Sequence, residues 1–252
     1  MSSASCLTRE SFRKLMKLVK NTQILSVILS LISTLYSVRD TSCNTEVTSE
    51  YRTLWPSSIA HNSVNLNFLH DILNLMIRQC MSVDPFNVAW LRTIGDIYFS
   101  QGLFTESLKF YLKLIVCETK YFSQQYQMQR VLNEKLLRNM MRSCFQLNKF
   151  THVACLSQYL PVIDYATAFK CFQEEICLDN MDDMFICIWD VGLLEYLIYI
   201  NSKRAYFDKR NLCMNICALP ETNESNPKDT RDTNIELKRI LLFLKLIKYY
   251  FL

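Results

Sequence analysis

Histidines, cysteines and carboxylates are the side chains that could do chemistry, and their spacing limits what that chemistry could be. The 252-residue chain has three histidines, His61, His70 and His152, and none stands beside a cysteine or another histidine at a spacing typical of zinc ligands. Cys213 and Cys217 lie one helical turn apart, but two ligands do not complete a structural zinc site. The sequence therefore predicts no metal site and no cofactor.

Eleven cysteines are distributed along the chain, an odd number without any CxxC pair. Most of them fall on apolar faces of expected helices, where a reduced cysteine serves as a small hydrophobic residue. A nucleophilic cysteine needs a partner base, and the sequence gives no sign of one. We therefore expect a reduced protein of the cytosol or nucleus.

Carboxylates cluster between residues 174 and 190, at Glu174, Glu175, Asp179, Asp182, Asp183 and Asp190. A catalytic carboxylate pair is one interpretation. The interpretation that we favour is a solvated loop between two helices, in which Asp179 or Asp182 caps the following helix. The P-loop, GxGxxG and GxSxG motifs do not occur in the sequence. We expect no catalytic residues and no small-molecule substrate.

Positive charge gathers in the last expected helix, residues 235–252. Lys238, Arg239, Lys245 and Lys248 spread over about half of its circumference, and the other half is Leu, Ile, Phe and Tyr. These four residues are candidate contacts with an acidic partner, a nucleic-acid backbone or a membrane surface. A helix that caps the fold with its charges in water explains the same pattern, and the sequence leaves both readings open. The formal net charge of +4 does not by itself imply a nucleic-acid partner.

The stretch that begins at residue 84 indicates the kind of structure that positions these side chains. Apolar residues recur at three- and four-residue steps in two runs, Val88, Leu91, Ile94 and Tyr98, then Phe104, Leu108, Tyr111 and Ile115. Gly102 lies between the runs, where glycine ends a helix in the left-handed conformation without steric cost. The stretch therefore predicts a helix hairpin.

The hairpin resembles a tetratricopeptide repeat, because Pro85, Trp90, Leu91, Gly95, Tyr98, Gly102, Ser107 and Tyr111 follow one another in the order of that repeat. Gly95 costs roughly 1 kcal/mol relative to alanine inside a helix. We expect close approach of the second helix at Ser107 to compensate. An ordinary antiparallel helix pair is the alternative.

Composition extends this pattern to the whole chain. Three glycines and five prolines are far below average usage of about 7% and 5%, which favours long helices joined by short loops. We predict an all-α fold of helical hairpins stacked as a tetratricopeptide-like solenoid. The expected parts are N-terminal helices with a Ser/Thr-rich loop at 1–62, the repeat array at 63–219, a linker at 220–234 and the basic helix at 235–252.

Helices are expected at 7–38, 63–81, 124–147, 152–160, 166–176, 181–203 and 206–219. The first is predicted to break near Asn21, and its second half is apolar nearly all round and should be buried. Residues 24–38 are too short and too rich in Ser and Thr for a membrane span, and no cleavage site follows them, so a signal peptide is not expected. Asp164 is expected to cap the helix that follows it.

Several longer blocks occur in an order that resembles the Integrator complex subunit 8 family. They are LSLISTLYSVRDTSCNTEV (29–47), LWPSSI (54–59), WLRTIGDIYFSQGLFTESLKFYL (90–112), VIDYATAFKCFQE (162–174), IWDVGLLEYLIYINSKR (188–204), DKR (208–210) and SNPKD (225–229). Together they cover most of residues 29–252 and are far more specific than one hairpin. Residues 1–22 show no such resemblance, and residues 124–134 diverge from the family pattern.

The resemblance implies a non-catalytic helical-repeat subunit of the nuclear Integrator complex. That assembly acts with RNA polymerase II in transcription termination, attenuation and small nuclear RNA 3'-end processing, and the family member helps to hold protein phosphatase 2A. The expected partners are other Integrator subunits and, through the complex, the phosphatase and the polymerase. Full members are several times longer and the chain resembles only their C-terminal part, so phosphatase docking by the family's N-terminal region is carried over to no residue here.

Two other functions fit the sequence without the resemblance. One is a stand-alone adaptor whose repeat groove captures peptide termini, although the inner helix of the hairpin offers only Arg92 and Asp96 for that purpose. The other is a protein that lies on a membrane surface through its C-terminal helix.

Overall fold

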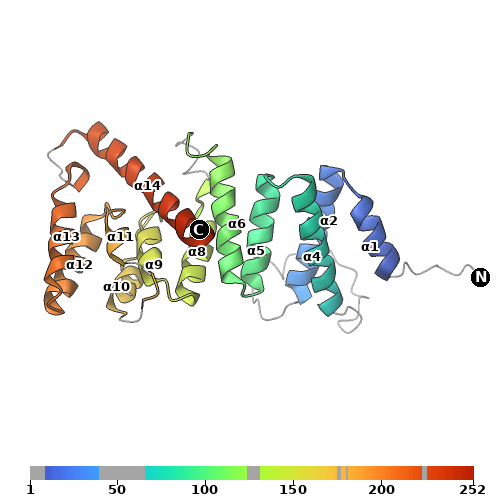
Figure 1. The fold of residues 1–252 in the computed structure, drawn as a ribbon, viewed down its shortest axis with the longest axis horizontal. Coiled ribbons are helices and arrows are strands. Elements are labelled where there is room, and N and C mark those ends of the chain that lie inside the picture. The colour runs from blue at the N-terminus through green and yellow to red at the C-terminus, as the bar shows by residue number, and fades with distance from the viewer. Residues whose placement is uncertain (1–8, 40–65, 124–130, 175–176, 180, 223–225) are drawn as a thin grey trace, which may run out of the picture. The chain divides into compact units, whose positions relative to one another are not determined.

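The computed structural model describes residues 9–39, 66–123, 131–174, 177–179, 181–222 and 226–252 (Figure 1). These residues form twelve α-helices and one 3-10 helix, with no strand among them. They divide into two compact units, Met1–Gln101 and Gly102–Leu252. Within the described ranges the all-α, tetratricopeptide-like class is confirmed, whereas the domain limits at residues 62 and 219 stay a prediction.

The first unit contains α1 (Arg9–Leu18), α2 (Thr22–Arg39), α4 (Leu66–Val83) and α5 (Val88–Ser100). α2 packs against α4 and α5, and α1 packs against α4. The expected break at Asn21 is confirmed, because its Oδ1 accepts hydrogen bonds from the backbone N–H groups of Gln23 and Ile24 at 2.9 and 3.1 Å. Asn21 thus caps the N-terminus of α2. The Ser/Thr-rich loop and His61 lie outside the described residues.

One face of α2 is buried and the other is not. Leu25 and Leu29 are at most 1% exposed, whereas Ile24 and Val27 are 50% and 59% exposed. The prediction that the second half of the expected helix at 7–38 is buried is therefore wrong for one face of α2, since α4 and α5 cover a single side of it within this unit. Trp90 joins α5 to the covered side, where its Nε1 donates a 2.7 Å hydrogen bond to Ser26 Oγ.

The turn after α5 has the backbone that its glycine predicts. Gly102 has a φ of +73°, in the left-handed region, directly after the C-cap residue Gln101. At the other end of α5, Asn87 Oδ1 accepts a hydrogen bond from the backbone N–H of Trp90. α6 (Phe104–Glu118) follows the turn. The expected approach of Gly95 to Ser107 stays a prediction.

The second unit contains α6, α8 (Glu134–Gln146), α9 (Phe150–Ser157), α10 (Tyr165–Gln173), α11 (Met181–Phe185), α12 (Val191–Lys203), α13 (Phe207–Cys217), the 3-10 helix η1 (Pro220–Thr222) and α14 (Lys228–Phe251). Neighbours along the chain pack on one another: α6 on α8, α8 on α9, α9 on α10, α10 on α12 and α12 on α13. α14 then returns along this unit and contacts both η1 and α6 (Figure 1). The last helix therefore ties the end of the row back to its beginning.

Two of the expected helices have different limits because polar side chains cap the backbone. Of the expected helix at 124–147, residues 124–130 lie outside the described residues. α8 begins at Glu134, since Asn133 is extended and its Oδ1 accepts from the backbone N–H of Leu136 at 2.9 Å. The expected helix at 181–203 is broken into α11 and α12. Gln158 Oε1 accepts from the backbone N–H groups of Trp189 and Asp190 in the gap, and Asp190 caps α12.

α14 begins at Lys228, whereas the sequence indicated a linker up to residue 234 and a helix from residue 235. Pro227 occupies the N-cap position, and Asp229 lies in the first turn, where a carboxylate favours the helix dipole. The first two turns carry polar residues on all sides because they are largely solvent-exposed. They therefore lack the apolar periodicity from which the helix start was inferred.

Candidate functional site: the surface around the C-terminal helix

Lys238 is buried, although it is one of the four basic residues expected to meet a partner. Its side chain is 8% exposed, and its Nζ lies 2.7 Å from Glu221 Oε1. The same Nζ donates a 2.8 Å hydrogen bond to the carbonyl oxygen of Ile188. A buried ammonium needs such partners, so Lys238 holds α14 on η1 and on the turn before α12. Its charge is not accessible to another molecule.

The other three basic residues differ in how far they reach the surface. Arg239 is partly exposed, is paired with Glu236, and has its guanidinium carbon 5.4 Å from the ring centroid of Trp189. Lys245 is partly exposed and pairs with Asp183. Lys248 is exposed. The structure thus places three of the four beside acidic side chains and does not bring them together as one basic patch.

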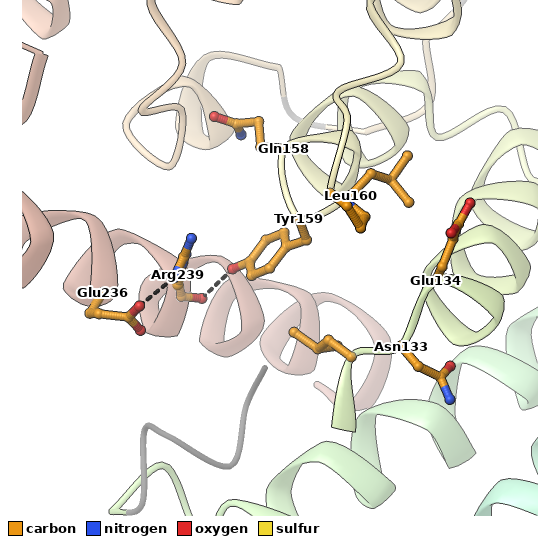
Figure 2. A pocket seen from close by; sticks show the side chains of 9 residues that line it. Asn133, Glu134, Gln158, Tyr159, Leu160, Glu236 and Arg239 are labelled. Atoms are coloured by element: carbon orange, nitrogen blue, oxygen red, sulfur yellow. Dashed lines mark hydrogen bonds and ion pairs between the residues drawn. The ribbon is translucent and has the colours of Figure 1, made fainter. Parts of the chain in front are cut away.

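A pocket of about 470 Å³ lies between α14 and the segments around α8 and α9 (Figure 2). Its lining includes Asn133, Gln158, Tyr159, Glu236 and Arg239. The Tyr159 hydroxyl donates a 2.9 Å hydrogen bond to the carbonyl oxygen of Arg239, so the ring lies against α14. Burial raises the pKa of this hydroxyl well above its usual value. Tyr159 is therefore a neutral donor that positions α14 and not a base.

Asp179 is the carboxylate of the 174–190 cluster that enters the protein interior. Its side chain is fully buried, and Oδ2 accepts a 2.9 Å hydrogen bond from the backbone N–H of His152, near the N-terminus of α9. The expectation that Asp179 or Asp182 caps the following helix is replaced for Asp179 by a cap on an earlier one. The helix N-terminus and the buried carboxylate satisfy each other, because the helix dipole and free N–H groups favour a negative charge there.

His152 is a buried core residue beside that cap. Its ring packs edge-on against Tyr249, with centroids 4.9 Å apart, and its Nδ1 lies 3.4 Å from the Tyr250 hydroxyl. Burial lowers the pKa of His152 to about 4, against the opposing effect of Asp179. The imidazole is thus neutral at physiological pH, and with the two tyrosines it anchors the C-terminal end of α14.

None of the described cysteines takes part in a disulfide bond. Burial raises the pKa of Cys144 and of Cys213 to about 12 and that of Cys217 above its ordinary value. These three remain protonated at neutral pH, and a thiol is a far weaker nucleophile and metal ligand than a thiolate. Among the described residues, no group of three or more His, Cys, Asp or Glu side chains is placed to hold a metal ion. No helix formed by these described residues has both the length and the hydropathy of a membrane span.

Comparison with known proteins decides the family. A family model described as "INTS8, TPR repeats" matches residues 1–250. The chain belongs to the Integrator complex subunit 8 family. Integrator complex subunit 8 of Homo sapiens is 32% identical over 251 residues, which are 99% of this chain and 25% of the human protein. The chain spans about a quarter of the length of this relative and of that from Xenopus laevis, which is 29% identical.

A shorter relative, the Integrator complex subunit 8-like protein of Dictyostelium discoideum, is 31% identical over 157 residues, which are 60% of this chain and 78% of that protein. The resemblance stated from the sequence blocks is confirmed. The match to the Integrator complex subunit 8 family also includes residues 1–22, for which the blocks showed no resemblance.

Sequence reasoning missed the residues that position α14. Glu221 and Tyr159 each meet a partner on α14 that is at least 17 residues away in sequence, and no spacing rule connects such residues. The burial of Lys238 had one signal in the sequence, which is its place as a charged residue within an apolar run. Such a residue either faces water or is paired with an opposite charge inside the protein.

Proposed function

We propose that this chain forms part of a non-catalytic scaffold subunit of the nuclear Integrator complex. The observation that carries the proposal is the match of residues 1–250 to the family of helical repeats named after that subunit. The curated relatives covering nearly the whole chain are themselves named as subunits of that complex. A helical-repeat protein offers long surfaces to other proteins, which suits this role.

In this role the chain contacts other Integrator subunits and contributes through the complex to RNA polymerase II termination and attenuation and to small nuclear RNA 3'-end processing. Association with protein phosphatase 2A belongs to the same assembly. Among the four basic candidates, Lys248 is the residue best placed for a partner, since it is exposed at the end of α14. Arg239 and Lys245 contribute only where a partner displaces their present acidic neighbours.

Affinity purification of the tagged chain from nuclear extract tests this proposal. We expect Integrator subunits and the phosphatase to be enriched over a tag-only control, and the tagged chain to be found in the nucleus by microscopy. A chain that stays in the cytoplasm and purifies without Integrator subunits contradicts the proposal and supports the stand-alone adaptor.

A further inference from the structure

We propose that the outer face of α14 binds an amphipathic α-helix of a partner protein whose apolar stripe is flanked by Asp and Glu. On α14 itself, the apolar residues of this outer face are called the outer stripe. They are Leu237, Ile240, Leu241, Leu244, Ile247 and Phe251. The inference adds the chemistry of a partner to the proposed function. It rests on the proposed function in one respect, namely that the partner is a protein of the Integrator complex.

α14 is apolar on two opposite faces. Its inner face, with Leu242, Phe243 and Leu246, is at most 1% exposed and packs into the second unit. On the outer stripe, Leu237, Leu244 and Phe251 are 56%, 48% and 40% exposed. The other three residues of the outer stripe, Ile240, Leu241 and Ile247, are partly buried. The stripe therefore keeps apolar surface in solvent along its whole length.

The spacing of the outer stripe is that of a helix–helix seam. Leu237, Ile240, Leu244, Ile247 and Phe251 alternate steps of three and four residues, as the a and d positions of a coiled coil do. At a rise of about 1.5 Å per residue the stripe is about 21 Å long, or about four helical turns. A second helix crossing at about 20° can insert side chains along this whole length. An extended peptide has a period of two and would meet only isolated contacts.

Charge selects an acidic partner. Lys248 is exposed within one turn of Leu244. Lys113 of α6 is also exposed, and its Nζ lies 5.8 Å from the centroid of the Phe251 ring. Glu236 at the other end is already paired with Arg239. Carboxylates beside the partner's apolar stripe would therefore meet unneutralised lysines.

The same charges disfavour two other occupants. A second copy of the chain would bring its own Lys248 and Lys113 to the seam, where like charges repel. An anionic membrane is broader than one helix and would reach the exposed carboxylates of Asp182 and Asp183, which lie beside α14 through the Asp183–Lys245 pair. A single helix about 10 Å wide avoids them.

Binding of a designed probe to the full chain tests the chemistry. The probe is a fluorescent synthetic helix of about three heptads, with Leu at a and d and Glu at e and g. The variant is Leu237→Glu with Leu244→Glu, and the matched control is Leu178→Glu with Leu103→Glu, whose leucines are 57% and 48% exposed. We expect at least about tenfold weaker binding by the variant and unchanged binding by the control, with thermal unfolding unchanged in both. A probe with Lys in place of Glu should bind less tightly than the acidic probe.

Equal probe binding by the wild type and the variant would overturn the inference, and so would preference for the Lys probe. A concentration-dependent dimer that the variant abolishes would replace the partner helix with a second copy. Capture of the wild type, but not of the variant, by phosphatidylserine vesicles would replace it with a membrane.

A photo-crosslinking amino acid at position 244, compared with one at position 178, then identifies the natural contact in the tagged chain. Crosslinks from position 244 to an acidic amphipathic helix support the inference, and crosslinks to a β-strand or a basic segment contradict it. Probe binding without Integrator subunits in the purification would reject the proposed function and leave the surface chemistry established.

Discussion

At the N-terminus of α9, Asp179 takes the place that a local capping residue holds in other helices of this chain. Replacing it by alanine removes the acceptor of the His152 backbone N–H inside the protein. We expect Asp179→Ala to lower the free energy of unfolding by about 1–3 kcal/mol, because a buried donor is left without a partner. Urea unfolding followed by circular dichroism measures this loss.

Asp182→Ala is the matched control for that measurement. Asp182 is half exposed and pairs with Lys209 at 3.2 Å, and an exposed pair of this kind contributes about 0–1 kcal/mol. Equal losses for the two variants would show that the hydrogen bond of Asp179 to α9 has no special weight.

His152 makes the stability of the second unit depend on pH. Its pKa is lowered to about 4 in the folded chain, mainly by burial, whereas the unfolded side chain titrates near 6.5. Between these values the unfolded state binds more protons, so the free energy of unfolding falls as the pH falls from about 6.5 to about 4, by up to about 1.4 kcal/mol per pH unit. His152→Gln should show a shallower pH dependence in this interval, measured by urea unfolding at a series of pH values. An unchanged slope would contradict a neutral buried imidazole.

At the level of elements, the ends of two helices test the preference of the left-handed backbone region for glycine, because one of them has glycine and the other has alanine there. Gly102 follows α5 with a φ of +73°, and Ala205 follows α12 with a φ of +58°. A side chain in this left-handed region costs about 1–2 kcal/mol. Gly102→Ala should therefore destabilise the chain by about 1 kcal/mol even though nothing lies within 4 Å of the added Cβ, and Ala205→Gly should stabilise it by about 0.5–1 kcal/mol.

Thermal unfolding of the two single variants and of the double variant measures these effects. The double variant should return close to the wild-type stability, because the two positions lie at different helix ends and their effects add. The same sign of change in both single variants would exclude backbone conformation as the cause.

Lys238 and Glu221 form a buried ion pair between α14 and η1. Removing one partner of such a pair costs about 3–5 kcal/mol because the other charge stays buried and uncompensated, whereas replacing both by apolar residues is often neutral. We expect Lys238→Met alone or Glu221→Leu alone to be strongly destabilising. The variant with Lys238→Met and Glu221→Leu should recover much of the loss, less the contribution of the Ile188 carbonyl that Lys238 no longer satisfies. Additive losses in this double-mutant cycle, followed by urea unfolding, would contradict coupling across the pair.

For the molecule as a whole, the sequence was sufficient where the physics is local. Apolar periodicity and Gly102 predicted α5, α6 and the turn between them, and Asn21 and Asp164 marked helix starts. It was insufficient where a residue acts on a distant element. Gln158 breaks the expected helix at 181–203 from 31 residues away, and Lys238 reaches Ile188 across 50 residues. Such contacts depend on packing that no single segment encodes, which is why the basic helix was expected to carry free charges and is instead partly anchored by them.

α14 gives the second unit its longest-range internal link, so deleting residues 227–252 should loosen helices far from the cut. Leu242, Phe243 and Leu246 are almost fully buried, and burial of each such side chain contributes about 1.5–3 kcal/mol. Their sum is comparable with the whole stability of a typical domain, about 5–15 kcal/mol.

Hydrogen exchange followed by mass spectrometry should show faster exchange in α8 and α9 of the truncated chain, and unchanged protection in α4, which belongs to the other compact unit. A chain ending at Tyr250 is the control, since it keeps the ring beside His152 and loses only Phe251 and the fully exposed Leu252. Unchanged protection of α8 and α9 after the long deletion would mean that the row of helices is stable without α14, and that the burial of its inner face does not hold these helices closed.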